Sequence, residues 1–234
     1  MKRLMTVIVV AIVLVGLTGN AAAQTVTGGQ VVYKSRTDTG SAIWWLDVAS
    51  RSYVQVTEGS YVDADPVLSP DRTRIAFISD RADGDTFNIY VVNVDGTNLQ
   101  RVTNNSNPQF APTWSSDNTQ LAYMQGLGRG QGFEINIVNV DGTNIRRLPR
   151  PEGQASSYSP DWSPDGTQIA FNALTNAGSY LFTVNVDGTN LRQLTLGDDV
   201  AYFPRWSPDS SKIAYRGRDE QTFYVNADGS GEVY

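Results

Sequence analysis

One sequence pattern recurs four times along this chain and constrains the fold more than any other feature. Each copy begins with a proline, continues through x-Trp-Ser or a close variant into a Pro-Asp or Ser-Asp turn, and ends in a short apolar segment. The lead prolines are Pro66, Pro112, Pro160 and Pro204. Successive prolines are 46, 48 and 44 residues apart, and a period of that length is typical of a solenoid, a propeller or a repeat array.

Each repeat divides into four short predicted strands, which we name a to d in chain order. Strand a runs into the Pro-x-Trp-Ser motif, strand b holds the apolar segment, and an Asp-Gly pair separates c from d. Pro-Asp favours a type I turn between a and b, and Asp-Gly favours a hairpin because Gly adopts positive φ without steric cost. We expect strand d to span 99–103, 145–148 and 191–195 in the three central repeats.

The predicted fold is all-β, a β-propeller of four-stranded antiparallel blades. Strands b and c are apolar on both faces, as blades packed between two neighbours require. A β-sandwich is the weaker alternative, since it would not need the same turn and the same Trp at a fixed offset in every unit.

Five repeat units are predicted, and the ring they form is expected to be open. Their approximate bounds are 30–60, 61–106, 107–154, 155–198 and 199–234. The first unit lacks its innermost strand a, and the last ends in a stub of strand d at 232–234. An open blade edge invites pairing with another chain. We therefore expect a truncated reading frame, with closure by residues 24–29 or by a second molecule as the alternatives.

The N-terminus has the organisation of a secretory signal peptide, predicted at residues 1–23. A basic start is followed by an apolar run at 4–17 and by small residues that end at Ala23. The run is shorter than the roughly 20 residues that span a bilayer, so cleavage before Gln24 is favoured over a retained anchor. The remaining chain, 24–234, is predicted to be periplasmic or secreted, without membrane insertion.

Composition narrows the chemistry that this chain can perform. It contains no histidine and no cysteine, which removes the commonest general base, the commonest transition-metal ligand and the usual nucleophile–base pairs. We therefore expect no enzyme activity and no cofactor. The net charge of −6 argues against nucleic acid, which calls for basic patches.

The repeats resemble a known family. The pattern Pro-x-Trp-Ser-Pro-Asp-Gly-x-x-Ile-Ala-Phe, followed by a strand and Asp-Gly-Thr-Asn-Leu-Arg-x-Leu-Thr, resembles the WD40-like repeat of TolB-type β-propeller proteins over residues 30–234. The resemblance implies export to the periplasm or beyond. TolB itself has an additional α/β domain, which we do not expect in this chain. Similar repeats form the gating propeller of prolyl-oligopeptidase-like peptidases, whose hydrolase domain we also do not expect within residues 30–234.

Two repeated positions are expected to be structural. Leu68, Trp114, Trp162 and Trp206 share one position, predicted to pack blade against blade. Asp71, Asp117, Asp165 and Asp209 share the a–b turn, on the same face as the four Asp-Gly turns. We interpret these eight aspartates as turn residues and predict no metal site, since a calcium loop beginning at Asn93 would need Glu at its twelfth position.

The opposite face is the predicted interaction surface, because it carries the loops that vary between repeats. Phe110, Tyr158 and Tyr202 stand two residues before their lead prolines, and Asp63 stands three before Pro66. Aromatic rings beside polar groups at a channel mouth suit capture of a protein or peptide. Simple packing of the channel is the alternative.

These observations favour a non-catalytic exported scaffold that binds a protein or peptide partner. The first alternative is the gating propeller of a prolyl-oligopeptidase-like peptidase whose catalytic domain lies outside this chain. The second alternative is a structural module that associates with itself through an open blade edge.

Overall fold

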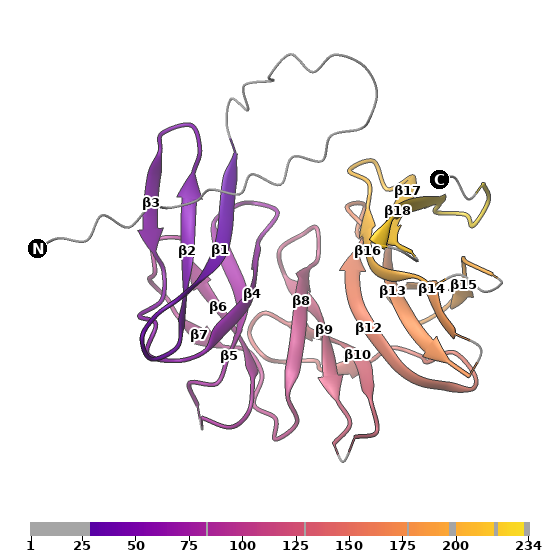
Figure 1. Ribbon diagram of the computed structural model, residues 1–234, viewed down its shortest axis with the longest axis horizontal. Coiled ribbons are helices and arrows are strands. Elements are labelled where there is room, and N and C mark those ends of the chain that lie inside the picture. Colours follow the sequence, from indigo (N-terminus) through magenta and orange to yellow (C-terminus); the bar gives the residue numbers. More distant parts are fainter. Residues whose placement is uncertain are drawn as a thin grey trace, which may run out of the picture.

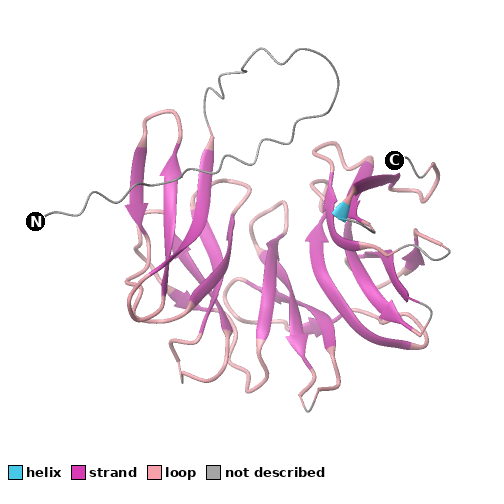
Figure 2. Ribbon diagram, viewed as in Figure 1, coloured by secondary structure: helices cyan, strands magenta, loops and turns pink. Residues whose placement is uncertain are grey.

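The computed structural model describes residues 29–82, 84–128, 130–176, 178–196, 200–217 and 220–231, apart from the side chains of 154 and 155. Strands and connecting loops make up this part of the chain, with one short helical turn at Glu220 (Figure 2). The predicted signal peptide and the expected strand at 232–234 lie outside the described residues. No helix in the described ranges is long and apolar enough to cross a membrane.

Five antiparallel sheets, which we call blades 1 to 5, follow one another in chain order around an arc (Figure 1). Blade 1 contains β1 (Gln30–Arg36), β2 (Ser41–Asp47) and β3 (Ser52–Gln55). Blade 2 contains β4 (Asp63–Leu68), β5 (Arg74–Ser79), β6 (Asn88–Asn93) and β7 (Gln100–Arg101). Blade 3 contains β8 (Gln109–Trp114), β9 (Gln120–Gly126), β10 (Phe133–Asn139) and β11 (Arg146–Arg147). Blade 4 contains β12 (Gln154–Trp162), β13 (Gln168–Thr175), β14 (Gly178–Asn185) and β15 (Arg192–Gln193). Blade 5 contains β16 (Tyr202–Trp206), β17 (Lys212–Arg216) and β18 (Thr222–Asn226).

The predicted propeller of four-stranded antiparallel blades is confirmed. Blades 2 to 4 have the strand order a-b-c-d. Strand a of a blade packs on strands b and c of the preceding blade, as β8 packs on β5 and β6. In the same way, β4 packs on β1 and β2. The described strands of blade 1 therefore correspond to b, c and d. Within the described ranges no strand of blade 1 pairs with a strand of blade 5, so closure of the ring and self-association stay predictions.

The hydrophobic core lies between blades. Strands b and c of blades 2 to 4 are buried on both faces, as their apolar sequences indicate. Ile137 of blade 3 and Phe171 of blade 4, for example, belong to one buried cluster, and Trp162 lies in the same cluster at 7% exposure. Each blade therefore depends on its neighbours for burial of its apolar side chains.

Two of the repeated tryptophans, Trp114 and Trp206, donate hydrogen bonds to the preceding blade. Trp114 Nε1 donates to the backbone oxygen of Val67 in blade 2, and Trp206 Nε1 donates to that of Asp161 in blade 4, both at 3.1 Å. Trp162 differs, because its Nε1 donates at 3.3 Å to the oxygen of Gly166 in its own turn.

Strand d is shorter than predicted: β7, β11 and β15 have two residues each. In blades 2 and 4 a threonine side chain bonds strand c just beyond the end of strand d. The hydroxyl of Thr103 accepts a hydrogen bond from Ile89 N at 2.8 Å, and Thr195 does the same for Leu181 N at 3.0 Å. A hydroxyl thus replaces the carbonyl that a longer strand would supply.

Candidate functional site

The innermost strand of each of blades 2 to 5 is kinked immediately before its lead proline. Its register against strand b shifts at this point in all four blades. The residue before the proline has positive φ in each: Asp65 (48°), Ala111 (49°), Ser159 (50°) and Phe203 (52°). A left-handed non-glycine residue before proline is sterically disfavoured, at a cost of order 1–3 kcal/mol. All four residues line one central cavity of about 350 Å³, so the strain is concentrated at the channel.

A second, mostly apolar cavity of about 470 Å³ brings three predicted site residues together. Phe110, Tyr158 and Tyr202, from blades 3, 4 and 5, all line it. Tyr202 is 37% exposed and its neighbour Phe203 is 51% exposed, with 6.4 Å between their ring centroids. These three side chains converge although successive ones are 48 and 44 residues apart in the sequence.

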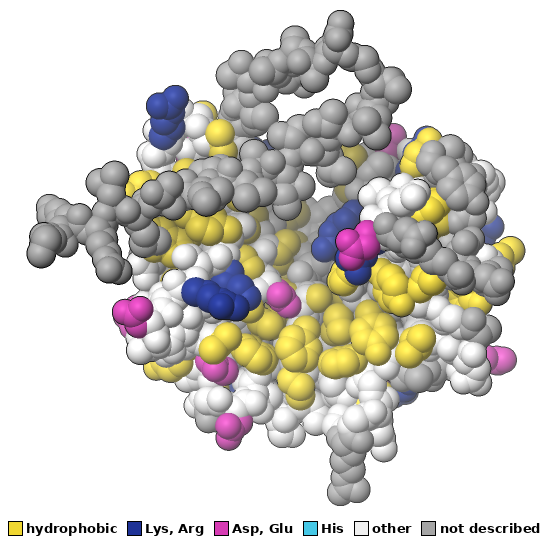
Figure 3. Space-filling view, in the orientation of Figure 1, with side chains coloured by type: hydrophobic (Ala, Val, Ile, Leu, Met, Phe, Trp, Pro, Cys, Tyr) yellow, Lys and Arg dark blue, Asp and Glu magenta, His cyan; other side chains and the backbone are white. Residues whose placement is uncertain are grey.

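A row of aromatic rings connects this cavity to blade 2. Phe87, Phe110, Phe133 and Tyr158 follow one another, with centroid separations of 5.8, 5.9 and 5.5 Å. The tilted and edge-to-face contacts between these rings are the preferred aromatic geometries. Figure 3 shows hydrophobic side chains gathered in a band across the middle of the molecule, in the region of blades 3 and 4. We call the rings of Phe87, Phe110, Phe133 and Tyr158 the aromatic row.

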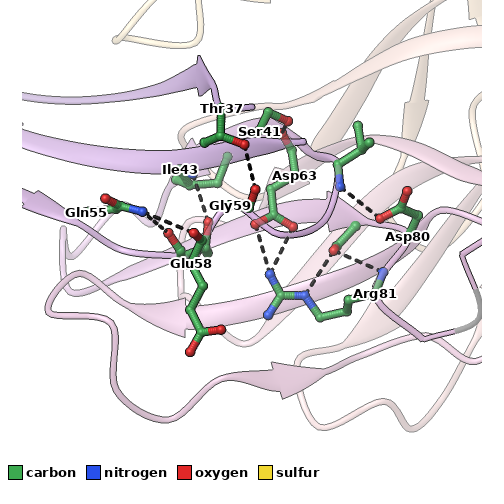
Figure 4. Close-up of polar contacts among 12 residues, drawn as sticks. Thr37, Ser41, Ile43, Gln55, Glu58, Gly59, Asp63, Asp80 and Arg81 are labelled. Atoms are coloured by element: carbon green, nitrogen blue, oxygen red, sulfur yellow. Dashed lines mark hydrogen bonds and ion pairs between the residues drawn. The ribbon is translucent and has the colours of Figure 1, made fainter. Parts of the chain in front are cut away.

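Asp63 does not lie at the channel mouth, which corrects the prediction for this residue. Its side chain is fully buried, and both carboxylate oxygens accept from Arg81 Nη2 at 2.9 Å (Figure 4). Ser41 of blade 1 donates to its backbone oxygen at 2.6 Å. The equivalent residues Gln109, Ser157 and Ala201 are also buried. The side chain at this position of strand a therefore lies between blades, and Asp63 contacts residues at the junction of blades 1 and 2.

Asn172 is among the residues of the apolar cavity that the sequence analysis missed. Asn172 on β13 lines the cavity, is 2% exposed, and pairs in register with Tyr158. The corresponding residues are the buried, apolar Ile78 and Met124 in blades 2 and 3, and the exposed Arg216 in blade 5. Among the buried residues at this repeat position, Asn172 is the polar one.

Two charged residues of the central cavity face each other between blades 4 and 5. Asp161 and Arg205 line it, with 3.8 Å between Oδ1 and Nη1. Burial raises the pKa of Asp161 to about 6, although the Arg205 charge and the Trp206 amide both favour the carboxylate.

The aspartates of the opposite face hold their own turns. Asp117, for example, accepts from the Ser115 hydroxyl at 2.6 Å and from the Thr119 amide and hydroxyl at 3.0 and 2.8 Å. The Ser115 hydroxyl is the largest cause of the lowered pKa of Asp117. In the described ranges no three acidic side chains gather as they would around a metal ion. The arrangement supports the interpretation of these residues as turn formers.

The fold and the cavities define a β-propeller scaffold with an aromatic-lined pocket at the inner ends of its blades. Residues 12–128 and 108–233 match the sequence family described as the TolB beta propeller domain. The chain therefore belongs to the TolB β-propeller family.

Solved structures of several proteins share the fold. A TolB-like protein of Agrobacterium tumefaciens is 24% identical, with a TM-score of 0.71 over 82% of this chain and 72% of that one. TolB of Acinetobacter baumannii is 16% identical, with a TM-score of 0.69 over 86% of this chain and 51% of that one. A puromycin-hydrolyzing peptidase of Mycobacterium tuberculosis is 16% identical, with a TM-score of 0.68 over 90% of this chain and 37% of that one.

Proposed function

We propose that this chain is a non-catalytic, exported scaffold that captures a protein or peptide at the inner ends of blades 3 to 5. The observation that carries the proposal is the convergence of Phe110, Tyr158 and Tyr202 in one cavity of about 470 Å³. A concave, mainly apolar pocket with a few polar groups is the usual form of a binding site. Exposed aromatic rings beside such a pocket supply the anchors on which binding energy concentrates.

Selection from a displayed random-peptide library on the purified chain tests this function. We expect enriched peptides to lose at least about tenfold in affinity when Tyr158 and Tyr202 are both replaced by Ala. Tyr53→Ala is the matched control, because Tyr53 is 68% exposed on the outer strand of blade 1. Unchanged affinity in the stable double variant, or no enrichment over an empty support, would refute the proposal.

Export and lack of catalysis have separate tests. Mass spectrometry of the chain recovered from an exporting bacterium should give Gln24 as the first residue, because cleavage is proposed after Ala23. The purified chain should leave peptide and glycan libraries uncut, since it has neither His nor Cys. A full-length N-terminus or a specific hydrolysis product would contradict the respective part of the proposal.

A peptidase gate is the second candidate, favoured by the likeness to the mycobacterial peptidase over 37% of that chain. A gating propeller restricts access to a hydrolase domain. The scaffold function and the gate function predict different results when the propeller is tested with and without a hydrolase domain. If a hydrolase domain encoded in the same reading frame cleaves larger peptides once the propeller is removed, the gate is the function. If the isolated propeller retains peptides through Tyr158 and Tyr202, the scaffold is the function.

A further inference from the structure

The aromatic rings of the apolar cavity lie beside one carboxylate. Asp65 lines this cavity together with Phe110, Tyr158, Tyr202 and Phe203. Asp65, Tyr202 and Phe203 are exposed, so a guest can reach them without rearrangement of the core. Among the described lining residues, Asp65 is the one that carries a charge.

A hydrogen bond places the carboxylate of Asp65 at the edge of the cavity. Its Oδ2 accepts from the backbone nitrogen of Ala111 in blade 3, at 3.3 Å. Ala111 lines both the apolar cavity and the central cavity, as Asp65 does. The carboxylate therefore lies against another residue of the lining, where the two cavities adjoin.

Two arginines of blade 5 lie next to this region, and each has a carboxylate beside it. Arg205 lines the central cavity, 3.8 Å from Asp161. Arg216 lies 3.7 Å from Glu220. Within the described ranges no ion pair involves Asp65. The charge of Asp65 therefore has no counter-charge among the described side chains.

The blade architecture does not require a carboxylate at position 65. The equivalent residues, each with positive φ immediately before its lead proline, are Ala111, Ser159 and Phe203. These three residues adopt the same backbone conformation with uncharged side chains. The kink in strand a therefore does not explain the charge of Asp65.

Blade 5 already contains a contact between a cation and a ring of this cavity. The guanidinium carbon of Arg216 lies 4.9 Å from the ring centre of Phe203. At such a separation the quadrupole of the ring attracts the cation. The cavity has three further rings, from Phe110, Tyr158 and Tyr202, so a cationic guest finds the same kind of partner there.

We propose that this cavity accepts the cationic end of a lysine or arginine side chain of the captured peptide. The inference rests on the proposed binding function and adds the chemistry of the anchor residue. The rings of Phe110, Tyr158 and Tyr202 contact its methylene carbons and attract its charge, and Asp65 supplies the counter-charge. The net charge of −6 on the whole chain also attracts a basic peptide at long range.

Titration of the full chain with two pairs of small probes, followed by NMR, tests the inference. The pairs are n-butylammonium with 1-butanol and n-propylguanidinium with n-propylurea, and the second member of each pair lacks the charge. We expect the cation of at least one pair to bind about tenfold more tightly than its uncharged partner. A cavity that is simply apolar gives the opposite order, because a cation loses more hydration on burial. The pair with the larger preference identifies lysine or arginine as the anchor, and either identity supports the proposal.

Asp65→Asn tests the carboxylate. Asparagine keeps an oxygen for the Ala111 amide and adopts positive φ readily, so the Tm should stay near that of the parent. The preference for the cation should fall by about threefold, and its dependence on salt should weaken. Asp95→Asn is the matched control. It makes the same change in net charge in a turn of the opposite face and should leave the preference intact.

Tyr202→Leu tests the rings, because leucine keeps apolar contact but has no π-system. Binding of the cation should weaken by about threefold, and binding of its uncharged partner should change less. Tyr53→Leu in blade 1 is the control, since Tyr53 is exposed and does not line the cavity.

Three results would overturn the inference. The first is equal or tighter binding of the uncharged partner in both pairs, and the second is no binding of either cation. The third is a preference for the cation that stays as strong in Asp65→Asn as in Asp95→Asn. Peptide capture through Tyr158 and Tyr202 would then still stand, so the two proposals fail separately.

Discussion

The carboxylate of Asp161 in blade 4 accepts a hydrogen bond from the backbone amide of Trp206 in blade 5, with 2.7 Å between Oδ2 and N. Burial raises the pKa of this carboxyl from 3.8 to about 6. The folded state therefore binds the proton more tightly than the unfolded state does. The contribution of Asp161 to stability is greatest below pH 3.8 and is lost as the pH rises through about 6.

Asp161→Asn should remove this pH dependence. The amide still offers an oxygen to Trp206 but carries no charge, so the free energy of unfolding at pH 7 should rise by about 1–3 kcal/mol. Urea denaturation between pH 4 and pH 7 measures the slope, which should flatten in the variant. Asp187→Asn is the control, because the Thr189 hydroxyl lowers the pKa of Asp187 and places its titration below this window. An unchanged slope in Asp161→Asn would contradict the assignment.

Gly142 is constrained both by its backbone and by the neighbouring blade. Its φ is +85°, and a Cβ built on it would lie 2.8 Å from the backbone oxygen of Val102 in blade 2. Gly142→Ala should therefore destabilise the chain by about 2–4 kcal/mol. Gly84→Ala separates the two causes, because Gly84 has φ +78° and no described atom within 4 Å of the built Cβ. It should cost only about 1 kcal/mol. Equal losses in chemical denaturation would show that the blade contact is unimportant.

The repeat made much of this structure predictable. Trp114 and Asp117 recur at fixed spacing, so their packing and turn roles could be inferred from any one copy. The convergence of Phe110, Tyr158 and Tyr202 followed from hairpin geometry alone. By contrast, the burial of Asp63 depends on Arg81, a residue of the next loop whose direction no repeat specifies.

Two other features depend on single side chains. Beyond the two-residue β7, the Thr103 hydroxyl accepts a hydrogen bond from the Ile89 amide in place of a backbone oxygen. Asn172 Nδ2 donates to the Ser179 hydroxyl at 3.3 Å, whereas Asn172 Oδ1 has no partner among the described residues. The sequence pattern of a strand shows where apolar and polar residues alternate and where turns fall. It does not show from which donor a given hydroxyl accepts a hydrogen bond. A comparison of each buried position across the blades would have shown Asn172 as the exception to Ile78 and Met124.

The Asp63–Arg81 pair at the junction of blades 1 and 2 should be strongly coupled. Asp63 is fully buried, and the Arg81 side chain is 14% exposed, with its guanidinium 5.2–5.4 Å from the ring centres of Tyr61, Phe77 and Tyr90. Asp63→Leu leaves this charge without a partner and should cost about 3–5 kcal/mol. The double variant Asp63→Leu/Arg81→Met should recover much of that loss, because it removes both charges. Additive losses in the double-mutant cycle would contradict a coupled pair.

Trp162 should be among the residues on which stability depends most. It is 7% exposed in the cluster that joins blades 3 and 4, so Trp162→Ala should cost about 3–5 kcal/mol through lost burial and the cavity left behind. Trp162→Phe keeps most of the ring contact and loses only the donor to Gly166, so its cost should be about 1 kcal/mol. Trp44→Ala is the control, since Trp44 is half-buried in blade 1 beside Tyr53 and should cost less than Trp162→Ala. A loss below about 1 kcal/mol for Trp162→Ala, measured by chemical denaturation, would contradict its place between the blades.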